Sequence, residues 1–174
     1  MAWFRRGSRD AATVEAGSAE AAGSSALVST DGGTGDLPLE PVLEKVPAAE
    51  QDRIAAAVDE LANAGVDVDD LASLGAGLDA AFGAWQSAGE GAREPHERIV
   101  ERFALGIGEH LHRHTDLRWQ VVTDAFGTDL AVAGGPRGGF VVVPTNLVAV
   151  RWLRREQGWV PGVVGHIVRR RNER

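Results

Sequence analysis

The sequence of 174 residues predicts an α+β domain, in which a small three-stranded antiparallel meander packs with about five helices, preceded by a disordered N-terminal leader. Three observations lead to this class. Apolar residues recur at helical spacing in residues 47–114 and 145–172, whereas they alternate with polar residues between 117 and 143. Residues 1–46 show neither pattern. We therefore expect one folded domain over residues 47–174, long enough to bury its own core.

The leader, residues 1–46, is acidic and rich in Ala, Gly, Ser and Thr. Its few large apolar side chains cannot offset the entropy lost on ordering, so we expect it to be disordered. Residues 1–92 carry five basic and 16 acidic side chains, whereas residues 93–174 carry 13 basic and nine acidic ones. The net charge of −7 therefore combines an acidic first half with a basic second half, which suggests either two functional regions or an acidic leader that screens a basic domain.

The composition also limits the compartment and the chemistry. The chain has no cysteine, which excludes disulfides, thiolate metal ligands and cysteine nucleophiles. The basic start MAWFRRGSRD is not followed by the apolar run of a secretory signal, and no stretch has the ~18 apolar residues of a membrane span. We expect a cytoplasmic protein that has no membrane partner.

Three helices are predicted between residues 47 and 114. The first begins at Pro47, a residue suited to a first turn, and ends before Gly65, which suits the position just past a helix C-terminus. The second follows the acidic residues 67–70, which suit the positive end of a helix dipole, and the third runs from about Pro95 to His114. Each has one apolar stripe: Ile54, Ala57, Val58 and Leu61; Leu71, Leu74, Leu78, Phe82 and Trp85; and Ile99, Phe103, Ile107 and Leu111.

Three strands and two helices are predicted after residue 116. LRWQVVT and TDLAVA alternate with the two-residue period of strands, and FVVV is a third strand closed by Pro144. Turn residues separate them. Thr145 or Asn146 suits the cap of a helix that runs to about Gln157 and stops at Gly158. Pro161 opens a last helix that reaches about residue 172.

The order of parts in residues 106–152 adds a resemblance. A glycine-containing helix ends in GEHL, LRWQVVTDAFGTDLAV follows, and FVVVPTNLVAVRW comes next. This block, about a quarter of the chain, is similar to an uncharacterised bacterial domain family, domain of unknown function 3806. The resemblance implies the same α+β arrangement and assigns no catalytic residue. Its strongest matches are Trp119, Asp124, Gly127, Pro144 and Arg151.

The segment GEHLHRHTD, residues 108–116, holds three of the five histidines. At helical spacing His110 and His114 lie one turn apart on one face, whereas His112 lies on the opposite side, so at most two of them share an ion. Zinc needs a third or fourth ligand, and the candidates are distant in sequence. Histidines in a last turn also suit the negative end of the helix dipole. We favour this second interpretation and assign no metal ligand.

Other motifs give no catalytic or cofactor site. DVDD at residues 67–70 lacks the glycine and the glutamate of an EF-hand loop. GGPRGG at residues 134–139 indicates a hairpin turn rather than a phosphate cradle. Asp124 and Asp129 flank the first hairpin turn, where carboxylates can transfer protons but are also common turn formers. No serine forms a nucleophile elbow. We therefore expect no cofactor.

The arginines near the C-terminus suggest a further alternative. No nucleic-acid reader motif accompanies them, so we favour a solvated face or one that binds the leader. The leading hypothesis is a non-enzymatic cytosolic module that binds a protein partner. The alternatives are a metal-dependent hydrolase that uses His110 and His114, and nucleic-acid binding through these arginines. These arginines form two groups. A helical stripe contains Arg151, Arg154 and Arg155, and a basic end contains Arg169, Arg170, Arg171 and Arg174.

Overall fold

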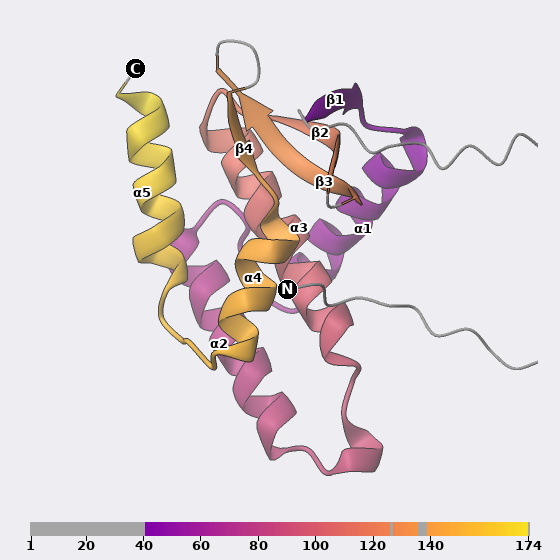
Figure 1. The fold of residues 1–174 in the computed structure, drawn as a ribbon. Coiled ribbons are helices and arrows are strands. Elements are labelled where there is room, and N and C mark those ends of the chain that lie inside the picture. Colours follow the sequence, from indigo (N-terminus) through magenta and orange to yellow (C-terminus); the bar gives the residue numbers. More distant parts are fainter. Residues whose placement is uncertain (1–40, 126, 136–138, 174) are drawn as a thin grey trace, which may run out of the picture. The chain divides into compact units, whose positions relative to one another are not determined.

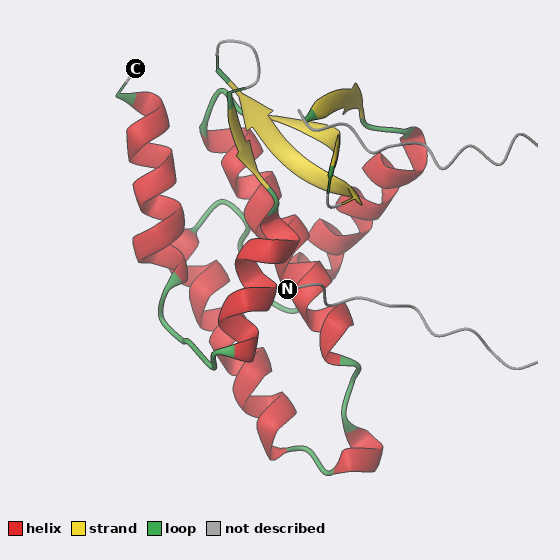
Figure 2. Ribbon diagram, viewed as in Figure 1, coloured by secondary structure: helices red, strands yellow, loops and turns green. Residues whose placement is uncertain are grey.

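Five α-helices and a four-stranded antiparallel sheet make up the described part of the chain (Figure 1, Figure 2). The computed structural model describes residues 41–125, 127–135 and 139–173. The predicted α+β class is confirmed. In chain order the elements are β1 (Val42–Lys45), α1 (Ala48–Asn63), α2 (Leu71–Ser87), a 3-10 turn (Glu90–Ala92), α3 (His96–His114), β2 (Arg118–Asp124), β3 (Gly127–Gly134), β4 (Phe140–Val142), α4 (Pro144–Leu153) and α5 (Val160–Asn172).

The sheet has the strand order β1-β2-β3-β4, and each strand is antiparallel to its neighbour. Strands β2, β3 and β4 are the predicted meander. Trp119 lies opposite Val132, which lies opposite Val142 on the next strand. Because paired residues share a face of the sheet, these three side chains point to the same side, and all three pack in the main hydrophobic core.

Strand β1 corrects the predicted start of the folded domain. Residues 42–45 were assigned to the leader, but they pair with β2, with Val42 opposite Thr123 and Lys45 opposite Gln120. The four residues VLEK are too few and too polar to give a strand signal of their own. Pairing with a strand about 75 residues later in the sequence stabilises them. The rest of the predicted disordered leader, residues 1–40, lies outside the described residues.

The first three helices follow the sequence closely. Pro47 is the N-cap of α1, and Gly65 adopts a left-handed φ of 76° just after that helix. Asp70 caps α2, because its side chain accepts a hydrogen bond of 2.9 Å from the backbone N–H of Ala72. Helix α3 covers the predicted residues, and every residue of its predicted apolar stripe is buried.

Helix α4 differs from the prediction at both ends. It begins at Pro144, and neither Thr145 nor Asn146 caps it, because proline is already preorganised for the first helical position. It ends at Leu153 rather than near Gln157. Arg155 has a φ of 57°, in the left-handed region, so the backbone turns out of the helix before Gly158 is reached.

Helix α3 lies at the centre of the packing. It contacts α1, α2, α4 and α5 and also the strands β2 and β3 (Figure 1). Two glycines on α3 allow this close approach. A Cβ atom at Gly106 would overlap the Leu61 side chain, and one at Gly108 would lie 2.6 Å from Cζ2 of Trp119 and 3.0 Å from Pro144. Helix α3 can therefore touch the sheet and α4 at the same time.

Adding a methyl group at Gly108 should destabilise the protein. We expect Gly108→Ala to lower the free energy of unfolding by roughly 1–3 kcal/mol, because the Trp119 ring and Pro144 must move. Gly83→Ala is the matched control, since nothing lies within 4 Å of that position in α2. There the better helix propensity of alanine should raise stability by up to about 1 kcal/mol. Urea denaturation distinguishes the two; equal effects would contradict the packing described.

Candidate functional site

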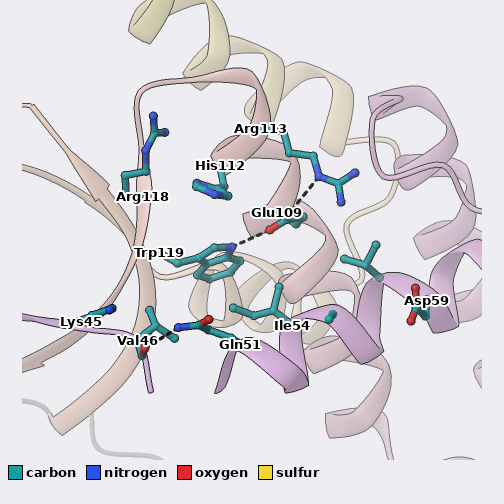
Figure 3. A pocket seen from close by; sticks show the side chains of 12 residues that line it. Lys45, Val46, Gln51, Ile54, Asp59, Glu109, His112, Arg113, Arg118 and Trp119 are labelled. Carbon is teal, nitrogen blue, oxygen red and sulfur yellow. Dashed lines mark hydrogen bonds and ion pairs between the residues drawn. The ribbon is translucent and has the colours of Figure 1, made fainter. Parts of the chain in front are cut away.

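A pocket of about 520 Å³ opens between α1, the end of α3 and the first residues of β2 (Figure 3). We call it the Trp119 pocket. Its apolar side comes from α1 and the Trp119 ring. Its polar side comes from α3 and the strands β1 and β2. The residues that line it are Lys45, Val46, Gln51, Ile54, Ala55, Val58, Asp59, Glu109, His112, Arg113, Arg118 and Trp119.

Glu109 fixes the indole ring of Trp119. The indole N–H of Trp119 donates to Oε2 of Glu109 at 2.9 Å, and Nε of Arg113 donates to Oε1 at 2.8 Å, as the dashed lines in Figure 3 show. The Glu109 side chain is only 15% exposed. Both carboxylate oxygens are thus engaged, and the ring is held in one orientation against the space left by Gly108.

The same polar chain continues from Arg113 into the residues before α2. Nη1 of Arg113 donates to Oδ2 of Asp69 at 2.9 Å, and Nε2 of His114 donates to the other oxygen of Asp69 at 3.0 Å. Burial alone would raise the pKa of Asp69, but the hydrogen bond from His114 and the Arg113 guanidinium hold that pKa below its ordinary value. Asp69 therefore ties the end of α3 to the connection between α1 and α2.

His110 and His114 lie on one face of α3, as predicted, with ring centroids 4.3 Å apart. Nδ1 of buried His110 lies 2.8 Å from the Val68 carbonyl, which can only accept, so this nitrogen carries a proton. Burial lowers the pKa of His110 further than this hydrogen bond raises it, and the nearby His114 lowers the pKa too. The charges of Asp69 and Asp70 raise the pKa, but they do not reverse the direction of the shift. The neutral ring is thus the favoured form.

The structure gives no support to the predicted metal alternative. No group of three His, Asp or Glu side chains that could hold a metal ion occurs within residues 41–125, 127–135 and 139–173. His112, on the opposite side of α3, lines the Trp119 pocket instead. Its Nδ1 donates to the Leu117 carbonyl at 3.0 Å. The three histidines thus have separate roles.

The basic end predicted at the C-terminus is not an open arginine surface. Arg171 is 4% exposed; it holds both carboxylate oxygens of Asp116 and lies over the Phe140 ring. The hydrogen bond from Arg171 holds the pKa of Asp116 below its usual value. Arg169 and Arg170 are exposed, and Arg174 lies outside the described residues. Arg171 therefore fastens α5 to the start of β2.

The predicted stripe on α4 is also partly occupied. Arg151 donates to the Leu147 carbonyl at 3.0 Å and lies over the Trp159 ring, 4.6 Å from its centroid. Arg154 lies 3.8 Å from Glu156. The alternative of nucleic-acid binding therefore has fewer free arginines than the sequence alone indicates, because the described chain already uses several of them.

The remaining motifs have local structural roles where the structure describes them. Besides the Asp70 cap, Asp67 accepts a hydrogen bond of 2.8 Å from the backbone N–H of Asp69. Asp124 ends β2, and Asp129 lies within β3 opposite Val122. Residues 136–138 of the GGPRGG turn lie outside the described residues. The Trp119 pocket itself was not predicted, since its walls come from two stretches that are distant in sequence, residues 45–59 and 109–119. The one sequence signal was the spacing of Glu109 and Arg113 by four residues.

Removing the Glu109 carboxylate should cost more than removing a surface carboxylate from the same helix. Glu109→Ala leaves the Trp119 indole N–H and the Nε–H of Arg113 without their acceptor, so we expect a loss of about 1–3 kcal/mol in unfolding free energy. Glu101→Ala is the control, because Glu101 makes an exposed ion pair with Arg53 and should cost at most about 1 kcal/mol. Similar losses in urea denaturation would argue against the Glu109 lock.

Acid should destabilise the protein through His110. Because its folded-state pKa lies below 6.5, the unfolded state takes up this proton first. Stability should fall as the pH drops through 6.5 toward the folded pKa, by at most about 1.4 kcal/mol per pH unit. His110→Asn keeps an N–H for the Val68 carbonyl and should flatten this dependence in denaturation curves. An unchanged slope in His110→Asn would refute the assignment.

None of the helices in the described residues has both the length and the apolar character needed to cross a bilayer. Comparisons of the chain with protein-family models, with curated proteins and with solved structures find no match. The resemblance of residues 106–152 to domain of unknown function 3806 therefore stays a prediction.

Proposed function

We propose that this protein is a non-enzymatic cytosolic interaction module, and that the Trp119 pocket receives a segment of a protein partner. The observation that carries the proposal is the fixed indole ring. Trp119 offers an apolar surface whose orientation is already set by Glu109, so little side-chain entropy is lost when a partner covers it. Tryptophan is also among the residues that contribute most to binding at protein interfaces.

The lining of the pocket supports binding more than catalysis. Its apolar wall comes from Ile54 and Val58 on α1, beside the Trp119 ring. Among the described residues that line the pocket, none carries a hydroxyl or a thiol that could serve as a nucleophile. The Glu109 carboxylate, which would be the nearest base for His112 along α3, is already bound by Arg113 and Trp119. These side chains hold the pocket in shape.

We also propose that the chain is a member of the family that it resembles, domain of unknown function 3806. The resembling block, residues 106–152, covers the second half of α3, the three strands of the meander and most of α4. It contains Glu109 and Trp119, which form the fixed part of the pocket. If the chain belongs to this family, we expect other members to have the same pocket, and no activity is established for the family.

Filling the pocket should abolish partner binding without disturbing the core. Ala55 is exposed on α1 and lines the Trp119 pocket, so Ala55→Trp should occlude it. Ala56→Trp is the matched control, because Ala56 is also exposed on α1 but lines a separate hollow beside Arg53 and Arg102. Proteins recovered with the full-length chain from native lysate should be lost with Ala55→Trp and retained with Ala56→Trp.

Circular dichroism confirms first that both variants are folded. Equal recovery with the two variants would place the partner elsewhere on the surface. Recovery of no protein by the wild-type chain under any condition would count against an interaction module.

A further inference from the structure

The charges around the Trp119 pocket are unevenly paired. Five lining residues carry full charges, the cations Lys45, Arg113 and Arg118 and the anions Asp59 and Glu109. Glu109 is occupied on both oxygens, and Arg113 is shared between Glu109 and Asp69. The charge of Arg113 is thus balanced inside the polar chain and adds little at the pocket.

Lys45 and Arg118 form no ion pair among the described residues. No carboxylate of the described residues lies within 4.0 Å of either side chain. Arg118 donates to the carbonyls of Thr115 and Leu117, and its charge helps to lower the pKa of Asp116, although both oxygens of that carboxylate are bound by Arg171. Two adjacent strands, β1 and β2, therefore each contribute one cation to the lining of the pocket, and in Figure 3 the two lie on either side of Trp119.

The opposite side of the pocket is mainly apolar. Ile54, Ala55 and Val58 of α1 line the pocket, and in Figure 3 the carboxylate of Asp59 lies well away from Lys45 and Arg118. Pockets of this kind bind through apolar contact and use a few polar groups to orient the ligand. The group that fits here has an apolar part and a negative charge on the strand side.

We propose that the pocket recognises an acidic segment of the partner protein, in which an apolar side chain covers Trp119 and a neighbouring carboxylate pairs with Lys45 and Arg118. This inference rests on the proposed function and names the chemistry of the partner. A basic segment would instead place like charges together, which is unfavourable at an interface.

Three short peptides provide the test. Acetyl-Ala-Leu-Glu-Leu-Ala-amide is titrated into the full-length, ¹⁵N-labelled protein, followed by the same peptide with Gln or Lys in place of Glu. The Trp119 indole N–H signal, assigned by Trp119→Phe, reports binding. We expect the Glu peptide to bind about three- to tenfold more tightly than the Gln peptide, and the Lys peptide to bind most weakly. Added salt should reduce this difference, because the two cations are near solvent.

The charge preference should depend on the two cations. Lys45→Gln combined with Arg118→Gln should make the Glu and Gln peptides bind equally. The control combines Arg154→Gln with Arg170→Gln, which removes the same charge from exposed positions that do not line the pocket, and the preference should persist. Loss of the preference in both double variants would show a general charge effect and overturn the inference.

The remaining outcomes separate this inference from the proposed function. Equal binding of the Glu and Gln peptides to the wild-type protein would overturn the inference, while loss of the partner in Ala55→Trp would still support the module. No response to any peptide up to about 10 mM would also overturn it. If Asp31→Asn with Asp36→Asn moves the Trp119 signal before any peptide is added, the chain's own leader is the acidic occupant and the partner assignment is wrong.

Discussion

The close approach of other elements to α3 is the constraint on which the rest of the structure depends. This helix contacts four helices and two strands, because two of its residues are glycines, which have no side chain to keep the neighbouring elements away. Gly106 admits Leu61 from α1, and Gly108 admits Trp119 from β2. Close packing of this kind tolerates little added volume. The position of the sheet and the orientation of the Trp119 ring therefore follow from the same pair of small residues.

The polar residues at the end of α3 add rigidity to that arrangement. Hydrogen bonds run from Trp119 through Glu109 and Arg113 to Asp69, and from Asp69 to His114. The His114 ring in turn stacks on the His110 ring. The end of α3 and the neighbouring strand β2 are thereby joined to the connection before α2, which lies much earlier in the sequence. Linked hydrogen bonds strengthen one another where water is partly excluded, so the pocket inherits the rigidity of the helix.

Much of the fold could be predicted from the sequence, because local signals determine it. The apolar stripes, Pro47, Gly65 and the acidic residues before α2 located the first three helices, and alternation located β2 to β4. Strand β1 and the ends of α4 could not be predicted. Strand β1 depends on pairing with β2. The C-terminal end of α4 depends on the left-handed backbone conformation of Arg155, which few non-glycine residues adopt. Helical geometry was enough to place the histidines on α3. The pocket could not be predicted in this way, because it depends on how α1, α3 and the strands lie relative to one another.

Lys45 has a chemical consequence that follows from its place in the pocket. It is the single lysine of the sequence, and it is the last residue of β1, at the lining of the Trp119 pocket. Acylating reagents and acetyl-transferring enzymes modify lysine amines but not guanidinium groups. Any such modification of a side-chain amine in this chain must therefore fall at the pocket, where it would replace the positive charge of Lys45, which forms no ion pair with a described residue, with a neutral amide.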